Sequence, residues 1–129
     1  MLAEDNEINQ LLAQTIIRQF GWEIDIAENG KIAIELMTKN LYDIILMDLK
    51  MPEMGGLEAT KIIRSTFKSP KSTIPIIALT ADITKSDIDK YNEVGINDFI
   101  IKPFNQADLR NKIIQLIKET KSKSEIFNT

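Results

Sequence analysis

The chain has 129 residues, 43% hydrophobic and 27% charged, with a net charge of −3. These values are ordinary for a single globular domain with a substantial core, and without a basic stripe they argue against nucleic-acid binding through this domain. The sequence contains no cysteine and no histidine, which excludes disulfides, thiolate metal sites and the most common general base. We find no apolar run long enough for a membrane span and no signal peptide, so we expect no membrane contact by this segment.

Helical and extended patterns alternate along the chain. Asn6 and Asn105 can cap helices at their start, and Gly21 and Gly95 can end them. The expected helices cover residues 7–20, about 31–38, 57–66, 86–94 and, after Asn105, a segment ending near Thr120. The expected strands cover residues 1–3, 22–26, 44–47, 76–79 and 98–101, and the second is half-exposed because its apolar residues alternate with charged ones.

This alternation predicts an α/β fold, a doubly wound five-stranded parallel sheet with five helices. Right-handed crossovers leave few topologies, and the strand order 2-1-3-4-5 is the expected one. We expect one domain over residues 1–120 and a polar C-terminal tail over residues 121–129. The first strand would be central in this sheet, although only three apolar residues precede the acidic pair at its end.

The stretch from Tyr42 to Pro52 contains the most informative strand. Its centre, Ile44–Met47, is continuously apolar, as in a strand buried on both faces, and it ends at Asp48. Parallel sheets bind ligands beyond the carboxyl ends of their strands, so Asp48 is a candidate site residue. The alternative, that Asp48 only caps the next helix, fits poorly because the helical pattern begins after Gly55-Gly56.

Four predicted strands end at polar residues: Glu4-Asp5, Asp48, Thr80 and Lys102. Because the carboxyl ends of parallel strands lie on one edge of the sheet, we expect these side chains to converge. Three carboxylates and one ammonium leave a surplus of about two negative charges, which requires a cation. With oxygen ligands only, Mg²⁺ is the expected metal.

An aspartate in such a site can attack a phosphoryl group to give an acyl phosphate. Mg²⁺, Lys102 and the Thr80 hydroxyl would neutralise and position the phosphoryl oxygens. Because the chain has no histidine, the phosphoryl donor would be another molecule.

Four motifs together resemble the receiver domain of two-component response regulators, over Leu2 to about Thr120. They are E-D-N-E-I-N (Glu4 to Asn9), I-I-L-M-D-L-K-M-P-E-M-G-G-L-E-A-T (Ile44 to Thr60), P-I-I-A-L-T-A (Pro75 to Ala81) and K-P-F (Lys102 to Phe104). The first motif and the G-L-E-A-T segment are most similar to receivers of hybrid histidine kinases. The resemblance implies a flavodoxin-like fold.

The resemblance also implies a role for each site residue. Asp48 is then the phosphoacceptor, and Thr80 and Lys102 contact the phosphoryl group. Asp5 and Asp48 would bind Mg²⁺ with the backbone carbonyl of Lys50, while Glu4 acts mostly through water. The Lys102-Pro103 peptide bond would be cis.

Signalling in this family implies partners and a switch. The donor would be a phosphohistidine on a histidine kinase or a histidine phosphotransfer protein. Phosphorylation would draw Thr80 inward, swing Phe99, and change the face formed by the fourth helix, fifth strand and fifth helix. Such a domain is not a conventional enzyme, although it assists its own phosphorylation and dephosphorylation. We expect a cytoplasmic location, either free or as the cytoplasmic part of a membrane-bound hybrid kinase.

The first predicted helix carries more apolar residues than one buried face needs. Leu12, Ala13, Ile16, Ile17 and Phe20 form one arc, which we expect to cover the sheet. Ile8 and Leu11 lie outside it. They are either buried under the last helix or form a docking patch for a helical partner.

Other functions fit less well. An aspartate-dependent phosphatase would carry a second aspartate at Lys50, and a flavin-binding protein would need a phosphate loop after the first strand. No G-x-x-x-x-G-K motif for nucleotide hydrolysis is present. The alternative that stays open is a phosphate-independent protein-binding module on the same fold. We also hypothesise that Lys50 and Asp82 pair at the mouth of the site.

Overall fold

The computed structural model describes residues 1–128 and contains a five-stranded parallel sheet in the order β2-β1-β3-β4-β5. The expected strand order is therefore confirmed. The strands are β1 (Leu2–Ala3), β2 (Ile26–Ala27), β3 (Ile45–Asp48), β4 (Ile76–Thr80) and β5 (Asp98–Ile101). The helices are α1 (Glu7–Gln19), α2 (Gly30–Lys39), α3 (Gly56–Thr66), α4 (Lys85–Val94) and α5 (Gln106–Asn128), with a short 3-10 turn, η1 (Lys71–Thr73).

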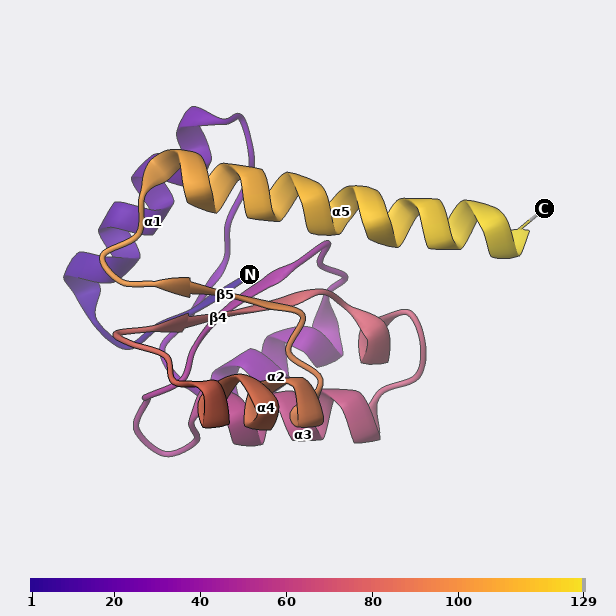
Figure 1. Ribbon diagram of the computed structural model, residues 1–129, viewed down its shortest axis with the longest axis horizontal. Helices are drawn as coiled ribbons and strands as arrows, with labels where there is room; N and C mark the ends of the chain where they lie inside the picture. Colours follow the sequence, from indigo (N-terminus) through magenta and orange to yellow (C-terminus); the bar gives the residue numbers. More distant parts are fainter. Residues whose placement is uncertain (129) are drawn as a thin grey trace.

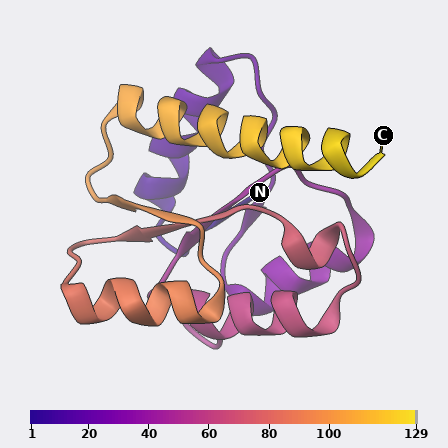
Figure 2. The same cartoon turned by 45° about the vertical axis from the view of Figure 1, so that its right-hand side comes forward.

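The helices form two layers around the sheet. Helices α1 and α5 cover one face, and α2, α3 and α4 cover the other (Figures 1 and 2). Strand side chains alternate between these layers, so that Leu46 packs with α1 and α5 while Ile45 and Met47 pack with the opposite helices. All of β3 is buried, as its continuously apolar sequence predicts. No helix in the described part of the chain combines the length and apolarity needed to cross a bilayer.

Side-chain caps set the starts of several helices. The Asn6 side chain accepts a hydrogen bond from the N–H of Asn9 at 3.0 Å, and Asn105 accepts from Asp108 at 3.1 Å. Both predicted caps are therefore confirmed. At the C-terminal end of α4, Gly95 adopts a φ of 97°, in the left-handed region that glycine favours.

Strand β2 is much shorter than predicted. Residues 22–26 were expected to be extended and paired, but only Ile26 and Ala27 join the sheet. The reason is the length of the partner strand, because β1 pairs through Leu2 and Ala3 alone. Alternation of apolar and charged residues thus identified a sheet-facing segment without showing how much of it had a partner.

Helix α5 continues beyond its predicted end near Thr120 and reaches Asn128. No glycine or proline occurs between Gln106 and Asn128, so nothing in the sequence forces the backbone to leave the helix. The expected tail therefore begins inside a helix, and its last residue, 129, lies outside the described residues. The division of the chain at residue 120 stays a prediction.

Candidate functional site

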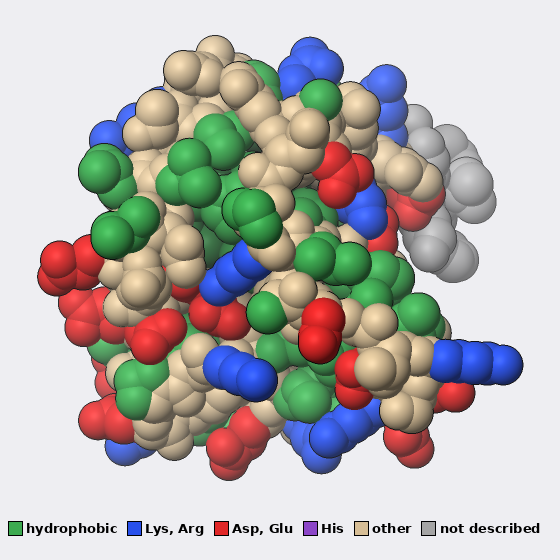
Figure 3. Space-filling view, turned by 60° about the vertical axis from the view of Figure 1, so that its left-hand side comes forward, with side chains coloured by type: hydrophobic (Ala, Val, Ile, Leu, Met, Phe, Trp, Pro, Cys, Tyr) green, Lys and Arg blue, Asp and Glu red, His purple; other side chains and the backbone are tan. Residues whose placement is uncertain are grey.

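The carboxyl ends of β1, β3, β4 and β5 meet along one edge of the sheet. β1 pairs with β3, which brings Glu4 and Asp5 beside Asp48. β5 pairs with β4 and is followed by Lys102, whose backbone N–H donates to the carbonyl of Thr80 at 2.7 Å. Acidic side chains gather on the side of the molecule shown in Figure 3, with basic side chains among them.

Three carboxylates form a cluster at this edge. Glu4, Asp5 and Asp48 each offer an oxygen atom, and these atoms lie within 4.8 Å of one another. Glu4 and Asp48 are buried, whereas Asp5 is exposed. The convergence predicted from the strand ends is therefore present, and the donor set consists of hard oxygen atoms of the kind that bind Mg²⁺.

Lys102 links the two buried carboxylates. Its Nζ lies 3.0 Å from Glu4 Oε2 and 3.0 Å from Asp48 Oδ2, and it also donates to Glu4 Oε1 at 3.2 Å. Burial of the ammonium would lower the pKa of Lys102, but Asp48 and Glu4 together raise it above its usual value. Lys102 is thus a permanent cation in contact with both carboxylates.

The two buried carboxyl groups titrate differently. Burial, followed by the neighbouring Asp48 carboxylate, raises the pKa of Glu4 to about 7. Burial alone would also raise the pKa of Asp48, but Glu4, Lys102 and the Lys50 N–H outweigh it and lower that pKa. Asp48 therefore stays ionised near neutral pH, which a carboxylate nucleophile requires.

The other predicted site residues lie around this cluster. The backbone N–H of Lys50 donates to Asp48 Oδ1 at 3.2 Å, while the Thr80 hydroxyl donates to the carbonyl of Asp82 at 2.8 Å. The Lys102-Pro103 bond is cis, as expected. No ion pair joins Lys50 to Asp82 among the described side chains, so the hypothesis that they pair is wrong for this structure.

The loop after Asp48 is held against it by close backbone packing. A Cβ atom built on Gly56 would lie 2.3 Å from the backbone oxygen of Asp48 and 2.8 Å from Met47 Cγ. Gly56 is the first residue of α3, so only a residue without a side chain allows the helix to start this close to the strand end. Glu53, in the same loop, has a φ of 64°.

Two residues of α1 donate hydrogen bonds to Glu4, and neither was among the predicted site residues. Asn9 Nδ2 donates to Glu4 Oε1 at 2.7 Å, and Gln10 Nε2 donates to the Glu4 carbonyl at 2.7 Å. Both lie near the start of α1, shortly after the acidic pair. Their amides could have been suspected because the first turns of a helix after a strand end face back toward that end.

Phe99, the predicted switch residue, is partly buried on β5. Lys112 of α5 donates to the Phe99 carbonyl at 2.6 Å and lies 5.2 Å from the centre of its ring. The same ammonium lies 3.3 Å from Asp98 Oδ1. Lys112 of α5 therefore contacts both the backbone and the ring of Phe99 in this structure.

The start of α1 presents an apolar surface. Ile8 is 78% exposed and Leu11 64%, so the alternative that α5 buries them is wrong. Leu12, predicted to face the sheet, is 41% exposed. The reason is that the start of α5 meets the C-terminal end of α1, where Gln106 donates to Gln19. The earlier turns of α1 are left uncovered.

Comparison with known proteins identifies the family. The family model described as "Response regulator receiver domain" matches residues 1–114. Hybrid signal transduction histidine kinase I of Dictyostelium discoideum is 42% identical over 135 residues, which cover 98% of this chain but 8% of that protein. Hybrid signal transduction histidine kinase B of the same organism is 40% identical over 92% of the chain, which spans 6% of its length.

Two solved structures are informative neighbours. The receiver domain of sensor histidine kinase PA1611 from Pseudomonas aeruginosa PAO1, solved with a magnesium ion in its active-site cleft, has a TM-score of 0.82 and 33% identity, covering 91% of this chain and 94% of that one. The receiver domain of Ssk1 in complex with the histidine phosphotransfer protein Ypd1, from Saccharomyces cerevisiae, has a TM-score of 0.80 and 32% identity, covering 89% and 85%. With the family model matching nearly the whole chain, the protein belongs to the response regulator receiver domain family.

Proposed function

We propose that Asp48 is the phosphoacceptor of this receiver domain in a two-component phosphorelay. The observation that carries the proposal is the position of Lys102, which is 3.0 Å from Asp48 and 3.0 Å from Glu4 inside a cluster of three carboxylates. An ammonium group in this position can stabilise the negative charge of the Asp48 carboxylate and then that of an incoming phosphoryl group. The lowered pKa of Asp48 keeps its oxygen available for attack.

In the proposed reaction, an Asp48 oxygen attacks the phosphorus atom of a partner phosphohistidine. The bond between phosphorus and the imidazole nitrogen breaks, and the product is an acyl phosphate on Asp48 with a free histidine on the partner. Lys102 contacts the transferred group, and Thr80 exchanges its bond with the Asp82 carbonyl for a phosphoryl oxygen. The domain would assist the later hydrolysis of the acyl phosphate through the same residues.

The carboxylate cluster fits Mg²⁺. Asp5, Asp48 and the backbone carbonyl of Lys50 would hold the ion, with Glu4 acting mostly through water. When bound, Mg²⁺ neutralises negative charge on the phosphoryl group and its acceptor. The fit rests on three carboxylate oxygens within 4.8 Å, which otherwise repel one another.

Phosphorylation would then change the surface formed by α4, β5 and α5. Movement of Thr80 toward the phosphoryl group would leave space that the ring of Phe99 can enter. Phosphate shifts the population between the two arrangements by its differential interaction with them. We further propose a cytoplasmic location, within a longer hybrid histidine kinase.

The test of this function is the intact mass of the protein after incubation with Mg²⁺ and acetyl phosphate, beside Asp48→Asn. We expect one added phosphoryl group that requires Mg²⁺ and is absent from the variant. An adduct that persists in Asp48→Asn would assign the acceptor to another residue. A folded protein with no adduct, from acetyl phosphate or from a phosphorylated histidine phosphotransfer protein, would favour the phosphate-independent binding module.

We propose that Ile8 and Leu11 dock the phosphohistidine-bearing partner. Their exposed apolar side chains lie on α1, next to the helix turn that holds Glu4, so a partner helix placed there lies beside the site. Replacing both residues by aspartate is expected to weaken binding of a histidine phosphotransfer protein such as Ypd1 at least about tenfold.

The matched control for this prediction is Leu41→Asp, because Leu41 is 75% exposed but lies outside α1. Isothermal titration calorimetry of the three proteins measures the difference. Equal affinities for the double variant and the original chain would show that docking uses another surface.

A further inference from the structure

The loop between β3 and α3, residues 49–55, contains the Lys50 carbonyl that would bind Mg²⁺ at the proposed metal site. The N–H of the same residue is held, because it donates to Asp48 Oδ1 at 3.2 Å. Within the described part of the chain, the carbonyl itself accepts no hydrogen bond. The direction of this oxygen therefore depends on how the rest of the loop is held.

The two ends of the loop are tied to the sheet and to each other. The Leu49 N–H donates to the Leu79 carbonyl at 3.3 Å, and the Gly56 N–H donates to the Leu49 carbonyl at 3.2 Å. A Cβ atom on Gly55 would lie 2.9 Å from that same Leu49 oxygen. Between these ends Glu53 has a φ of 64°, a conformation that residues with a side chain keep only where their surroundings enforce it.

The third attachment of the loop is the first residue of α2, which belongs to a distant part of the sequence. The Gly30 N–H donates to the Met54 carbonyl at 2.9 Å. A helix leaves its first N–H groups without an internal acceptor, so the Met54 carbonyl takes up a free donor at the positive end of the helix dipole. The same helix end is fixed by the buried Asn29, whose side chain accepts from the Ile32 N–H at 2.9 Å.

The contact between Gly30 and Met54 leaves no room for a side chain on α2. A Cβ atom on Gly30 would lie 2.7 Å from the Met54 backbone oxygen, 2.8 Å from its Cγ and 3.0 Å from its Cβ. The Cγ atom could rotate away, but the oxygen moves only with the backbone of the loop. The φ of Gly30 is not positive, so close approach rather than backbone conformation requires a glycine here.

We propose that Gly30 is a positioning residue for the metal site, because its contact with Met54 fixes the loop that presents the Lys50 carbonyl to Mg²⁺. This inference rests on the proposed role of that carbonyl as a metal ligand. Helix α2 thus acts on the site through one backbone hydrogen bond and one close contact. The affinity for Mg²⁺ then depends on a residue that has no side chain.

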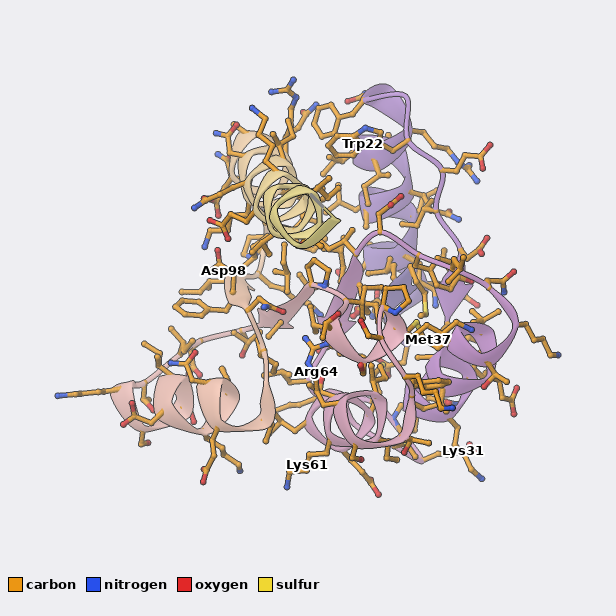
Figure 4. The ribbon with its side chains drawn as sticks, turned by 90° about the vertical axis from the view of Figure 1, so that its right-hand side faces the viewer. Trp22, Lys31, Met37, Lys61, Arg64 and Asp98 are labelled. Atoms are coloured by element: carbon orange, nitrogen blue, oxygen red, sulfur yellow. The ribbon has the colours of Figure 1, made fainter. Side chains whose placement is uncertain are left out.

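The test compares Gly30→Ala with Met37→Ala in the full chain. Met37 is fully buried on the same helix, about two turns further along, so its removal weakens the packing of α2 away from the contact with Met54. In Figure 4, α2 and α3 lie side by side, with Met37 and Lys31, the residue after Gly30, labelled. We expect Gly30→Ala to weaken Mg²⁺ binding at least about tenfold in isothermal titration calorimetry. We expect Met37→Ala to keep the original affinity, although it lowers the urea midpoint.

A second measurement requires no metal. Amide exchange at residue 30 and at Lys50 in the metal-free protein reports whether the loop is held. We expect both amides to exchange at least about tenfold faster in Gly30→Ala but not in Met37→Ala, because only the first change opens the loop locally. Unchanged exchange at both amides in Gly30→Ala would overturn the proposal.

The metal titration separates this inference from the function on which it rests. If the original chain binds Mg²⁺ and Gly30→Ala binds it equally well, the proposal alone is overturned, since the position of the loop does not matter to the metal. If the original chain binds no Mg²⁺, the proposed metal site fails and the inference fails with it.

A variant on the loop side keeps the proposal testable if Gly30→Ala does not fold. Glu53→Pro displaces the loop, because proline fixes φ near −65° and cannot adopt 64°. Its control is Glu53→Gly, which accepts a positive φ. We expect Glu53→Pro to weaken Mg²⁺ binding and to speed exchange of the Gly30 amide, since both depend on the same loop. Weaker binding with an unchanged Gly30 amide would overturn the proposal.

Discussion

Replacing Lys102 by methionine is expected to slow phosphorylation of Asp48 at least about a hundredfold, the usual effect of removing one donor that stabilises charge in a transition state. Methionine keeps most of the length of the side chain but removes the ammonium that contacts both buried carboxylates. The affinity for Mg²⁺ is expected to stay the same or to increase, because the ammonium competes with the metal for the same oxygen atoms. Slower phosphorylation without weaker Mg²⁺ binding would distinguish the loss of the charge from a loss of structure at the site.

The measurements are the rate of adduct formation with acetyl phosphate and a magnesium titration. Lys71→Met is the matched control, since it removes the same charge from a lysine that donates to the Thr38 carbonyl, away from the carboxylates. We expect this control to keep the original rate. If Lys102→Met keeps it as well, Lys102 has no role in phosphoryl transfer.

Replacing Gly56 by alanine is expected to destabilise the protein by about 3 kcal/mol, at the upper end of the cost of overpacking. The new methyl group would lie 2.3 Å from the Asp48 backbone oxygen, so either α3 or the end of β3 must move. Neither can move freely, because β3 is buried and paired on both sides. The displaced strand end would also disturb the carboxylate cluster.

Urea denaturation measures this effect, with Gly21→Ala as its control. Gly21 has a φ of 80°, but no atom lies within 4 Å of the position that a new methyl group would occupy. Alanine there meets backbone strain alone, which costs about 1 kcal/mol. Equal losses at the two positions would mean that the contact between Gly56 and Asp48 carries no special constraint.

Much of the site could be predicted because its residues follow directly from strand ends. Asp48 ends a continuously apolar run, and Lys102 follows the last strand, so parallel topology alone brings them together. The positions of the caps at Asn6 and Asn105 were equally local, since each depends on hydrogen bonds three residues away. The sequence predicts the position of a residue well where that position depends on a single strand or a single turn.

The features that could not be predicted depend on a segment that lies far away in the sequence. The length of β2 depends on β1, and the exposure of Leu12 depends on where α5 crosses α1. The bonds from Asn9 and Gln10 to Glu4 depend on how α1 is placed after its strand. The direction of the Thr80 hydroxyl is a rotamer choice that no pattern of residue types encodes.

The strand order also governs when the site can form during synthesis. β1 leaves the ribosome first among the strands yet occupies an interior place in the sheet, and Met1 bonds to a residue 43 positions later. Glu4 and Lys102 are separated by 98 residues, so the ion pair closes only after β5 has emerged. Until then the nascent domain carries its acidic residues without their lysine partner. The ion pair between Glu4 and Lys102 is therefore one of the last contacts that the domain can form during synthesis.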